Sequence, residues 1–147
     1  MPDRLLVVDD EIDFAKFAGQ VGESAGYEAR VTSNAKDFKE DFEHWHPSVV
    51  ILDLSMPEVD GVELLRWLSE QHWHAQLIIM SGFDERVVEA AKMVGEERGL
   101  CISYALSKPV RMRELREKLE SLKGRTALTP ETKGIASPAG GNRAQST

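Results

Sequence analysis

Hydrophobic residues recur along the chain in short runs that alternate with segments of helical periodicity. The run over residues 4–9 is aliphatic and β-branched, which is typical of a strand buried on both faces. Similar runs occupy residues 27–32, 48–53, 77–80 and 100–106. The run over 48–53 is the most uniformly apolar, so we expect it at the centre of a sheet.

Between these runs, hydrophobic residues are spaced three and four positions apart, as on one face of an amphipathic helix. We predict helices over residues 11–24, from 33 or 34 to 45, from about 62 to 71, from 84 to about 97, and from about 110 to 123. Ser33 or Asn34 and Asp84 are expected N-caps, and Gly26 and Gly99 are expected helix stops. Five strands alternating with five helices predict an α/β fold with a parallel sheet covered on both faces.

Composition fits one domain of ordinary size. The chain has 147 residues, of which 41% are hydrophobic and 29% are charged. We expect the domain to span residues 1–123. Residues 124–147 are half Gly, Pro, Ser and Thr, which cannot offset the entropy of ordering, so we expect a disordered tail or linker there.

Charge and targeting signals narrow the function classes. The formal net charge of -7 argues against direct nucleic-acid binding, which needs concentrated Lys and Arg. The chain has neither a basic leader followed by a long apolar run nor 18 consecutive apolar residues, so we expect no export signal and no membrane contact. The lone Cys101 cannot form an internal disulfide, and we expect a cytoplasmic protein.

Reactive residue types follow the predicted strands at their carboxyl ends. The first strand ends in Asp9 and Asp10 and the third in Asp53, while the fourth runs into Ser81 and the fifth into Lys108. Taken singly, these residues also suit helix caps, turns, a loop hydroxyl or a surface lysine. Because ligands bind beyond the carboxyl ends of parallel strands, four such strand ends together predict a site.

The residue types in this predicted site indicate phosphoryl transfer. Clustered carboxylates repel one another, so Asp9, Asp10 and Asp53 need a cation to stay ionised together. Hard oxygen ligands with room for water favour Mg2+. With the metal bound, Asp53 would be a carboxylate nucleophile facing a phosphoryl group. The Lys108 ammonium and the Ser81 hydroxyl would hold the phosphoryl oxygens.

Two segments resemble the receiver domain of bacterial response regulators in two-component signalling systems. Residues 7–11 (VVDDE) are similar to the acidic-pair segment of that family. Residues 53–61 (DLSMPEVDG) match its phosphoacceptor segment, in which Asp, Met-Pro and Asp-Gly keep this spacing. Ser81 and Lys108–Pro109 occupy its hydroxyl and lysine positions. The resemblance covers residues 4 to about 123, and it implies a flavodoxin-like strand order, 2-1-3-4-5.

The resemblance implies a phosphoacceptor rather than an enzyme acting on its own substrate. Asp53 would take a phosphoryl group from a phosphohistidine on a sensor histidine kinase or a histidine phosphotransfer protein, and the domain would assist both this step and its own dephosphorylation. Asp10, Asp53 and the backbone carbonyl of Ser55 would bind Mg2+ directly, and Asp9 would act through water. Ser55 and Phe83 occupy positions that tune the lifetime of the phosphoryl group in the family.

The resemblance also implies an output through altered protein contacts. Ser81 and Lys108 would report the phosphoryl group to the face made by the fourth helix, the fifth strand and the fifth helix. An unknown downstream protein would bind there, or a homodimer would form on phosphorylation. The family's switch aromatic lies three residues before the lysine, where this chain has Ala105. Tyr104 does not simply substitute, because adjacent strand residues point to opposite faces.

Two alternatives remain open. A phosphatase or phosphotransferase of the haloacid dehalogenase type also uses a strand-end Asp, a hydroxyl and a Lys. That class has a second Asp two residues after the nucleophile, where this chain has Ser55, and its acidic pair follows the lysine, whereas Asp9 and Asp10 precede it. A receiver-like binding module that works without phosphorylation is the other alternative, and Ala105 is the residue that favours it.

Overall fold

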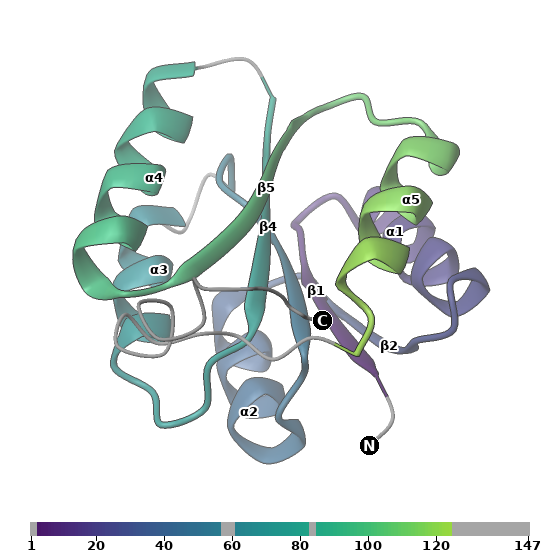
Figure 1. Ribbon diagram of the computed structural model, residues 1–147, viewed down its shortest axis with the longest axis horizontal. Helices are drawn as coiled ribbons and strands as arrows, with labels where there is room; N and C mark the ends of the chain where they lie inside the picture. Colours follow the sequence, from purple (N-terminus) through teal and green to yellow (C-terminus); the bar gives the residue numbers. More distant parts are fainter. Residues whose placement is uncertain (1–2, 57–60, 83–84, 125–147) are drawn as a thin grey trace, which may run out of the picture.

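A parallel β-sheet forms the middle layer of the protein (Figure 1). The computed structural model describes residues 3–56, 61–82 and 85–124. Its five strands are β1 (Arg4–Val8), β2 (Glu28–Thr32), β3 (Val49–Asp53), β4 (Gln76–Ser81) and β5 (Cys101–Ser107). They are arranged in the order β2-β1-β3-β4-β5, with every neighbouring pair parallel. The predicted flavodoxin-like order is confirmed, and the winding reverses between β1 and β3.

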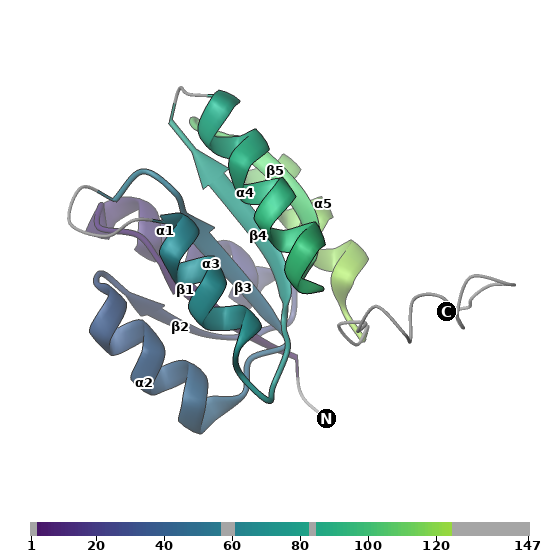
Figure 2. The ribbon, with the colours of Figure 1, turned by 90° about the vertical axis from the view of Figure 1, so that its left-hand side faces the viewer.

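Helices cover both faces of this sheet. In the described ranges there are five: α1 (Ile12–Ser24), α2 (Ala35–Trp45), α3 (Gly61–Ser69), α4 (Glu85–Arg98) and α5 (Met112–Leu122). The helices α1 and α5 lie on one face, and α2, α3 and α4 lie on the other (Figures 1 and 2). None of these helices is long and apolar enough to cross a membrane.

Two hydrophobic clusters fill the spaces between the layers. Between the sheet and α2, α3 and α4, the ring of Trp67 contacts Phe38 and Phe42 at centroid distances of 6.3 and 5.6 Å. Between the sheet and α1 and α5, Leu115 and Leu119 are fully buried. All five residues of β3 are buried, so its predicted central position is confirmed. Full burial of each large apolar side chain stabilises the fold by roughly 1.5–3 kcal/mol.

Several helix ends follow the predicted signals. Asn34 is the N-cap of α2, and its side chain accepts a hydrogen bond from the amide of Asp37 at 2.8 Å. Gly26 and Gly99 follow α1 and α4 with φ angles of +95° and +77°, which glycine adopts without the steric penalty of a Cβ atom. These residue types therefore end or begin helices for the expected physical reasons.

Other helix ends differ from the prediction. The helix α3 ends at Ser69 rather than near Gln71, because the chain tightens there into turns with i to i−3 hydrogen bonds. The helix α5 is shorter than predicted at both ends, since Arg111 and Lys123 have extended backbones. The expected N-cap Asp84 lies outside the described residues, as does nearly all of the predicted tail, so the boundary at residue 123 remains a prediction.

The strand β5 contains a bulge that decides where its side chains point. Ile102 and Tyr104 pair with consecutive residues of β4, which leaves Ser103 as an extra residue. Ile102 and Ala105 consequently pack on the side of α4, whereas Tyr104 packs on the side of α5. The expectation that Tyr104 and Ala105 lie on opposite faces of the sheet is confirmed.

Candidate functional site

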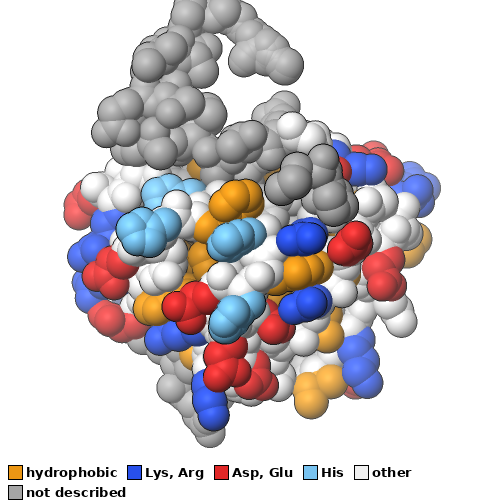
Figure 3. Space-filling view, turned by 90° about the horizontal axis from the view of Figure 1, so that it is seen from below, with side chains coloured by type: hydrophobic (Ala, Val, Ile, Leu, Met, Phe, Trp, Pro, Cys, Tyr) orange, Lys and Arg blue, Asp and Glu red, His pale blue; other side chains and the backbone are white. Residues whose placement is uncertain are grey.

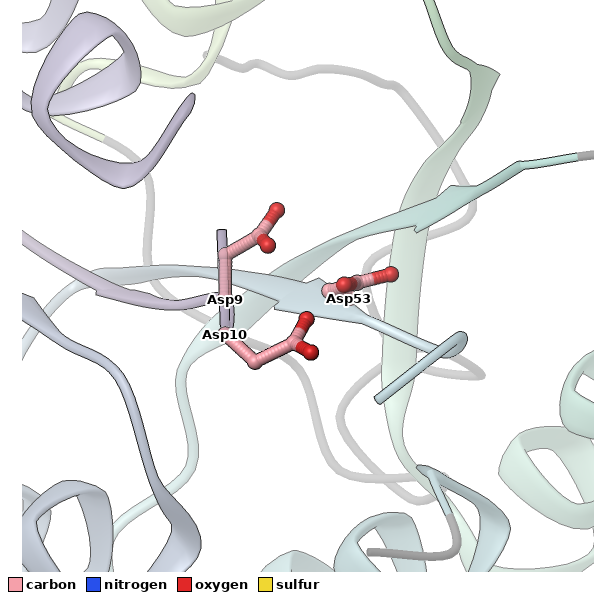
Figure 4. A group of neighbouring side chains, drawn as sticks. All are labelled: Asp9, Asp10 and Asp53. Carbon is pink, nitrogen blue, oxygen red and sulfur yellow. The ribbon is translucent and has the colours of Figure 1, made fainter. Parts of the chain in front are cut away.

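Three carboxylates converge at the carboxyl edge of the sheet (Figure 4). Asp9 and Asp10 follow β1, and Asp53 ends β3, so they flank the point where the strand order reverses. A carboxylate oxygen from each lies within 4.8 Å of the others. Asp9 and Asp53 are only 0% and 2% exposed, whereas Asp10 is exposed. One side of the cluster is therefore buried, and the other faces solvent.

Backbone hydrogen bonds fix the residues that carry this edge. The amide of Asp9 donates to the carbonyl of Thr32 at 3.1 Å, and the amide of Lys108 donates to the carbonyl of Ser81 at 2.9 Å. Both bonds continue the sheet beyond the ends of the strands. The side chains of Asp9 and Lys108 therefore leave the sheet from rigid positions.

Each buried carboxylate also organises the loop that follows it. The Asp53 side chain accepts from the amide of Ser55 at 2.9 Å, and the Asp9 side chain accepts from the amide of Glu11 at the same distance. Both are bonds from a carboxylate to the backbone two residues later, which favour a tight turn. The Ser55 hydroxyl accepts from the amide of Gly82 at 3.2 Å, so it joins the loops after β3 and β4.

Lys108 extends its ammonium group into this acidic cluster. Its Nζ atom lies 2.7 Å from Asp9 Oδ2, 2.9 Å from Glu11 Oε1 and 3.5 Å from Asp53 Oδ2. The same atom is 4.4 Å from the centre of the Phe14 ring, a distance typical of a cation–π contact. The side chain of Lys108 is only 14% exposed, so these partners surround it closely.

Burial and charge together shift the acid–base properties of the site. Burial raises the pKa of Asp53 from 3.8 to about 6, and the charge of Asp9 acts in the same direction, while the Ser55 amide and Lys108 oppose it. Burial lowers the pKa of Lys108, but its hydrogen bonds to Asp9 and Glu11 outweigh this effect and raise it overall. The site contains several carboxylates but one ammonium group among the described residues, so a bound cation would balance the excess negative charge.

The residues present fit a hard divalent cation. Carboxylate oxygens with access to water are the ligands that Mg2+ prefers, and the exposed Asp10 supplies that access. Burial and repulsion raise the pKa of Asp53, so a cation would favour its ionised form. Ser55, whose carbonyl is the expected further ligand, lies in the loop directly after β3.

Ser81 lies beside the acids on the neighbouring strand. In the register of the sheet Asp53 pairs with Met80, so Ser81 is one residue beyond the partner of Asp53. Ser81 is 4% exposed, and its hydroxyl forms no hydrogen bond with any other residue that the structure describes. A hydroxyl at this position lies on the strand next to Asp53 and can reach a group attached to that residue.

Two contacts of Lys108 were not predicted from the sequence. Glu11 contributes a third carboxylate, and the ring of Phe14 lies against the ammonium. Glu11 and Lys108 are 97 positions apart, so no local spacing indicates that they meet. Their contact depends on how the β5–α5 loop is placed relative to the start of α1, and only the three-dimensional structure reveals it.

The histidines lie at the opposite edge of the molecule. His44 lies in the last turn of α2 and His46 is its C-cap, while His72 and His74 precede β4, so all four are near the amino ends of the strands. Figure 3 shows histidine side chains gathered on this face, where the ring of His46 stacks on Trp73 at 4.9 Å. Within the described ranges, the group that could hold a metal is the acidic one.

Fold and site together define a doubly wound α/β domain with an acidic cluster at the carboxyl edge of its sheet, and the comparisons give its family. The chain belongs to the response regulator receiver domain family of two-component systems, whose family model matches residues 5–120. It is 31% identical to the chemotaxis protein CheY of Treponema pallidum, over 82% of this chain and 83% of that protein. A response regulator from Colwellia psychrerythraea has 27% identity and a TM-score of 0.71, covering 83% of this chain and 97% of the other.

The relatives differ from this chain in length. It is 26% identical to the alkaline phosphatase synthesis transcriptional regulatory protein PhoP of Bacillus subtilis, over 87% of this chain and 51% of that protein. The chain thus spans about half the length of PhoP, and a smaller share of the regulatory protein AtoC of Escherichia coli. Family membership therefore applies to the receiver domain and does not define an output.

Proposed function

We propose that this chain accepts a phosphoryl group on Asp53, from a phosphohistidine of a sensor histidine kinase or a histidine phosphotransfer protein, in a Mg2+-dependent reaction. The cytoplasm is the proposed compartment. The observation that carries the proposal is the placement of the buried Asp53 carboxylate within 4.8 Å of two other carboxylates and 3.5 Å from Lys108 Nζ. A nucleophile, a set of cation ligands and a fixed positive charge are the parts that phosphoryl transfer needs.

In the proposed reaction, an oxygen of Asp53 attacks phosphorus. The bond from phosphorus to the histidine nitrogen breaks, and the imidazole leaves with the electron pair and takes up a proton. A bound Mg2+, held directly by Asp10, Asp53 and the Ser55 carbonyl and through water by Asp9, would neutralise charge on the phosphoryl oxygens. The product is an acyl phosphate on Asp53.

Lys108 and Ser81 have separate tasks in this scheme. The ammonium of Lys108 lies 3.5 Å from Asp53 Oδ2 and would bond to one phosphoryl oxygen. The buried hydroxyl of Ser81 would donate to another oxygen. Each bond forms only in the phosphorylated protein. Each can therefore shift the segment that carries Lys108 or Ser81 when Asp53 is phosphorylated.

Exposed apolar residues border the site and suit a protein donor. Ile12 at the start of α1 is 55% exposed, and Met112 at the start of α5 is 56% exposed. Both helices begin at the edge of the sheet where Asp53 lies, because they follow β1 and β5. A donor protein that brings its phosphohistidine to Asp53 would cover these two side chains.

The proposed response is a change in contacts on the face made by α4, β5 and α5. A groove of about 500 Å³ lies there, lined by Lys92, Glu96, Leu100, Ile102, Ser103, Tyr104 and Ala105. The small Ala105 side chain leaves this groove open beside α4. Its occupant is an unknown downstream protein or a second copy of the chain in a phosphorylation-dependent homodimer.

The open groove also favours a second candidate, a binding module that works without phosphorylation. In that case, partners would bind the α4–β5 groove equally well whatever the state of Asp53. The presence of the whole set of phosphorylation residues supports the phosphoacceptor more strongly. A haloacid dehalogenase-type enzyme fits less well, because the position for its general acid is Ser55, whose amide instead holds the Asp53 carboxylate.

Site mapping tests the proposed function against both alternatives. The protein is incubated with acetyl phosphate and Mg2+, the acyl phosphate is reduced with borohydride, and peptides are analysed by mass spectrometry. We expect the reduced residue at position 53 and none in Asp53→Asn. Sustained hydrolysis of a small phosphate ester such as p-nitrophenyl phosphate would indicate a phosphatase, and neither a trapped residue nor hydrolysis would indicate the binding module.

A further inference from the structure

The side chain of Glu11 is used for an interaction other than helix capping. Glu11 is the N-cap of α1, with φ −82° and ψ 99°, yet its side chain forms no cap hydrogen bond. Its Oε1 atom lies 2.9 Å from Lys108 Nζ instead. The Glu11 side chain is 67% exposed, so it remains free to move with the ammonium.

This contact occupies one of the donors that Lys108 could otherwise give to a phosphoryl oxygen. An ammonium has three N–H donors, and Lys108 gives one to Asp9 at 2.7 Å and one to Glu11 at 2.9 Å. Asp53 is farther away, at 3.5 Å, and the Phe14 ring covers another side of the ammonium. Lys108 is therefore directed toward Asp9 and Glu11 more than toward Asp53.

The two carboxylates that hold Lys108 differ in what a cation would do to them. Asp9 belongs to the acidic cluster, so a bound cation would compete with Lys108 for it. Glu11 is outside that cluster and would keep its negative charge free for Lys108. With metal present, Glu11 is thus the carboxylate that continues to compete with a phosphoryl group for the ammonium.

We propose that Glu11 is a positioning residue that holds Lys108 back from the phosphoryl group and so slows phosphorylation of Asp53. The inference rests on the proposed function of Asp53. An exposed ion pair is worth up to about 1 kcal/mol, so removing it should strengthen phosphoryl binding by about two- to fivefold.

Two variants separate this role from a general effect of charge. Glu11→Gln removes the charge while keeping the size of the side chain. Asp13→Asn removes one negative charge from the first turn of the same helix, and Asp13 is exposed and forms no ion pair in the described part of the chain. A further pair, Lys108→Met with and without Glu11→Gln, tests whether the effect acts through Lys108.

Two readouts are measured with Mg2+ present. The first is the dissociation constant for beryllium fluoride, a stable mimic of a phosphoryl group, by calorimetry. The second is the rate of adduct formation with acetyl phosphate by intact-protein mass spectrometry. We expect Glu11→Gln to bind beryllium fluoride about two- to fivefold more tightly and to react correspondingly faster. We expect Asp13→Asn to stay close to the wild type, and Glu11→Gln to have no effect in the Lys108→Met background.

The possible results distinguish this inference from the proposed function. A wild-type protein that binds beryllium fluoride, with Glu11→Gln equal to Asp13→Asn or weaker than the wild type, overturns the inference alone. A Glu11→Gln effect that persists without Lys108 also overturns it. A wild-type protein that binds neither probe overturns the proposed function, and the inference with it. An unchanged circular dichroism spectrum of Glu11→Gln, and the same binding result with Glu11→Ala, would show that altered folding does not cause the effect.

Discussion

Asp53 weakens the folded state of the metal-free protein at neutral pH. Its pKa is raised from 3.8 to about 6, chiefly by burial, so the folded chain binds this proton more tightly than the unfolded chain does. The free energy of unfolding therefore falls as pH rises from about 4 to about 6 and then levels off. A shift of about two pKa units corresponds to about 3 kcal/mol, as an upper limit.

Asp53→Asn is therefore expected to stabilise the metal-free protein at pH 7. The amide cannot ionise, and its oxygen can still accept from the Ser55 amide. We predict a gain of about 1–3 kcal/mol in the free energy of unfolding at pH 7, which disappears near pH 4. Urea denaturation at both pH values measures it, with Asp13→Asn as the surface control. Equal stability of wild type and Asp53→Asn at pH 7 would contradict this interpretation.

At the scale of single elements, the start of α3 packs closely against the strand that carries Asp53. A Cβ atom at Gly61 would lie 2.9 Å from the Cα atom of Leu54, the residue directly after Asp53. Backbone atoms at this distance cannot move aside as a flexible side chain can. A glycine at position 61 therefore allows α3 to pack closely against the residue that follows Asp53.

Gly61→Ala is expected to destabilise the protein by about 1–3 kcal/mol, because the added methyl group would force α3 away from Leu54. Thermal or urea unfolding measures the change. Gly82→Ala is a matched control at the same edge, since among the described residues a Cβ atom there would meet Ser55 Oγ at 3.7 Å, an ordinary contact. A Gly61 variant that unfolds like the Gly82 variant would show that the close approach is relieved at no cost.

The sequence predicted the elements whose signals are local. The uniformly apolar β3 was expected at the centre, and the Asn34 cap and the glycine stops follow from their own chemistry. The bulge at Ser103 was not predicted, because it depends on the register with β4. The contact between Glu11 and Lys108 was missed for a similar reason, since it joins residues brought together only by the whole fold.

At the scale of the whole molecule, charge is distributed unevenly. The chain has a formal net charge of -7, and three carboxylates meet at one edge of the sheet. Histidine side chains gather at the opposite edge, among acidic and basic side chains (Figure 3). Among the described residues, the three carboxylates are the group that could hold a metal ion.

Mg2+ is expected to stabilise the whole protein through this edge. A ligand that binds only the folded state at ten times its Kd contributes about 1.4 kcal/mol, or a rise of about 5 °C in Tm for a domain of this size. Differential scanning fluorimetry with MgCl2, compared with NaCl at equal ionic strength, measures the shift. We expect it to be lost in Asp10→Asn. An equal shift in both salts would mean that the ion acts only by screening.

The most direct experiment is intact-protein mass spectrometry after incubation with acetyl phosphate, with and without Mg2+, on the wild type and Asp53→Asn. We expect a single added phosphoryl group on the wild type with Mg2+, almost none when the metal is chelated, and none on Asp53→Asn. An unmodified wild type under every condition, or an equally modified Asp53 variant, would contradict phosphoryl transfer to Asp53.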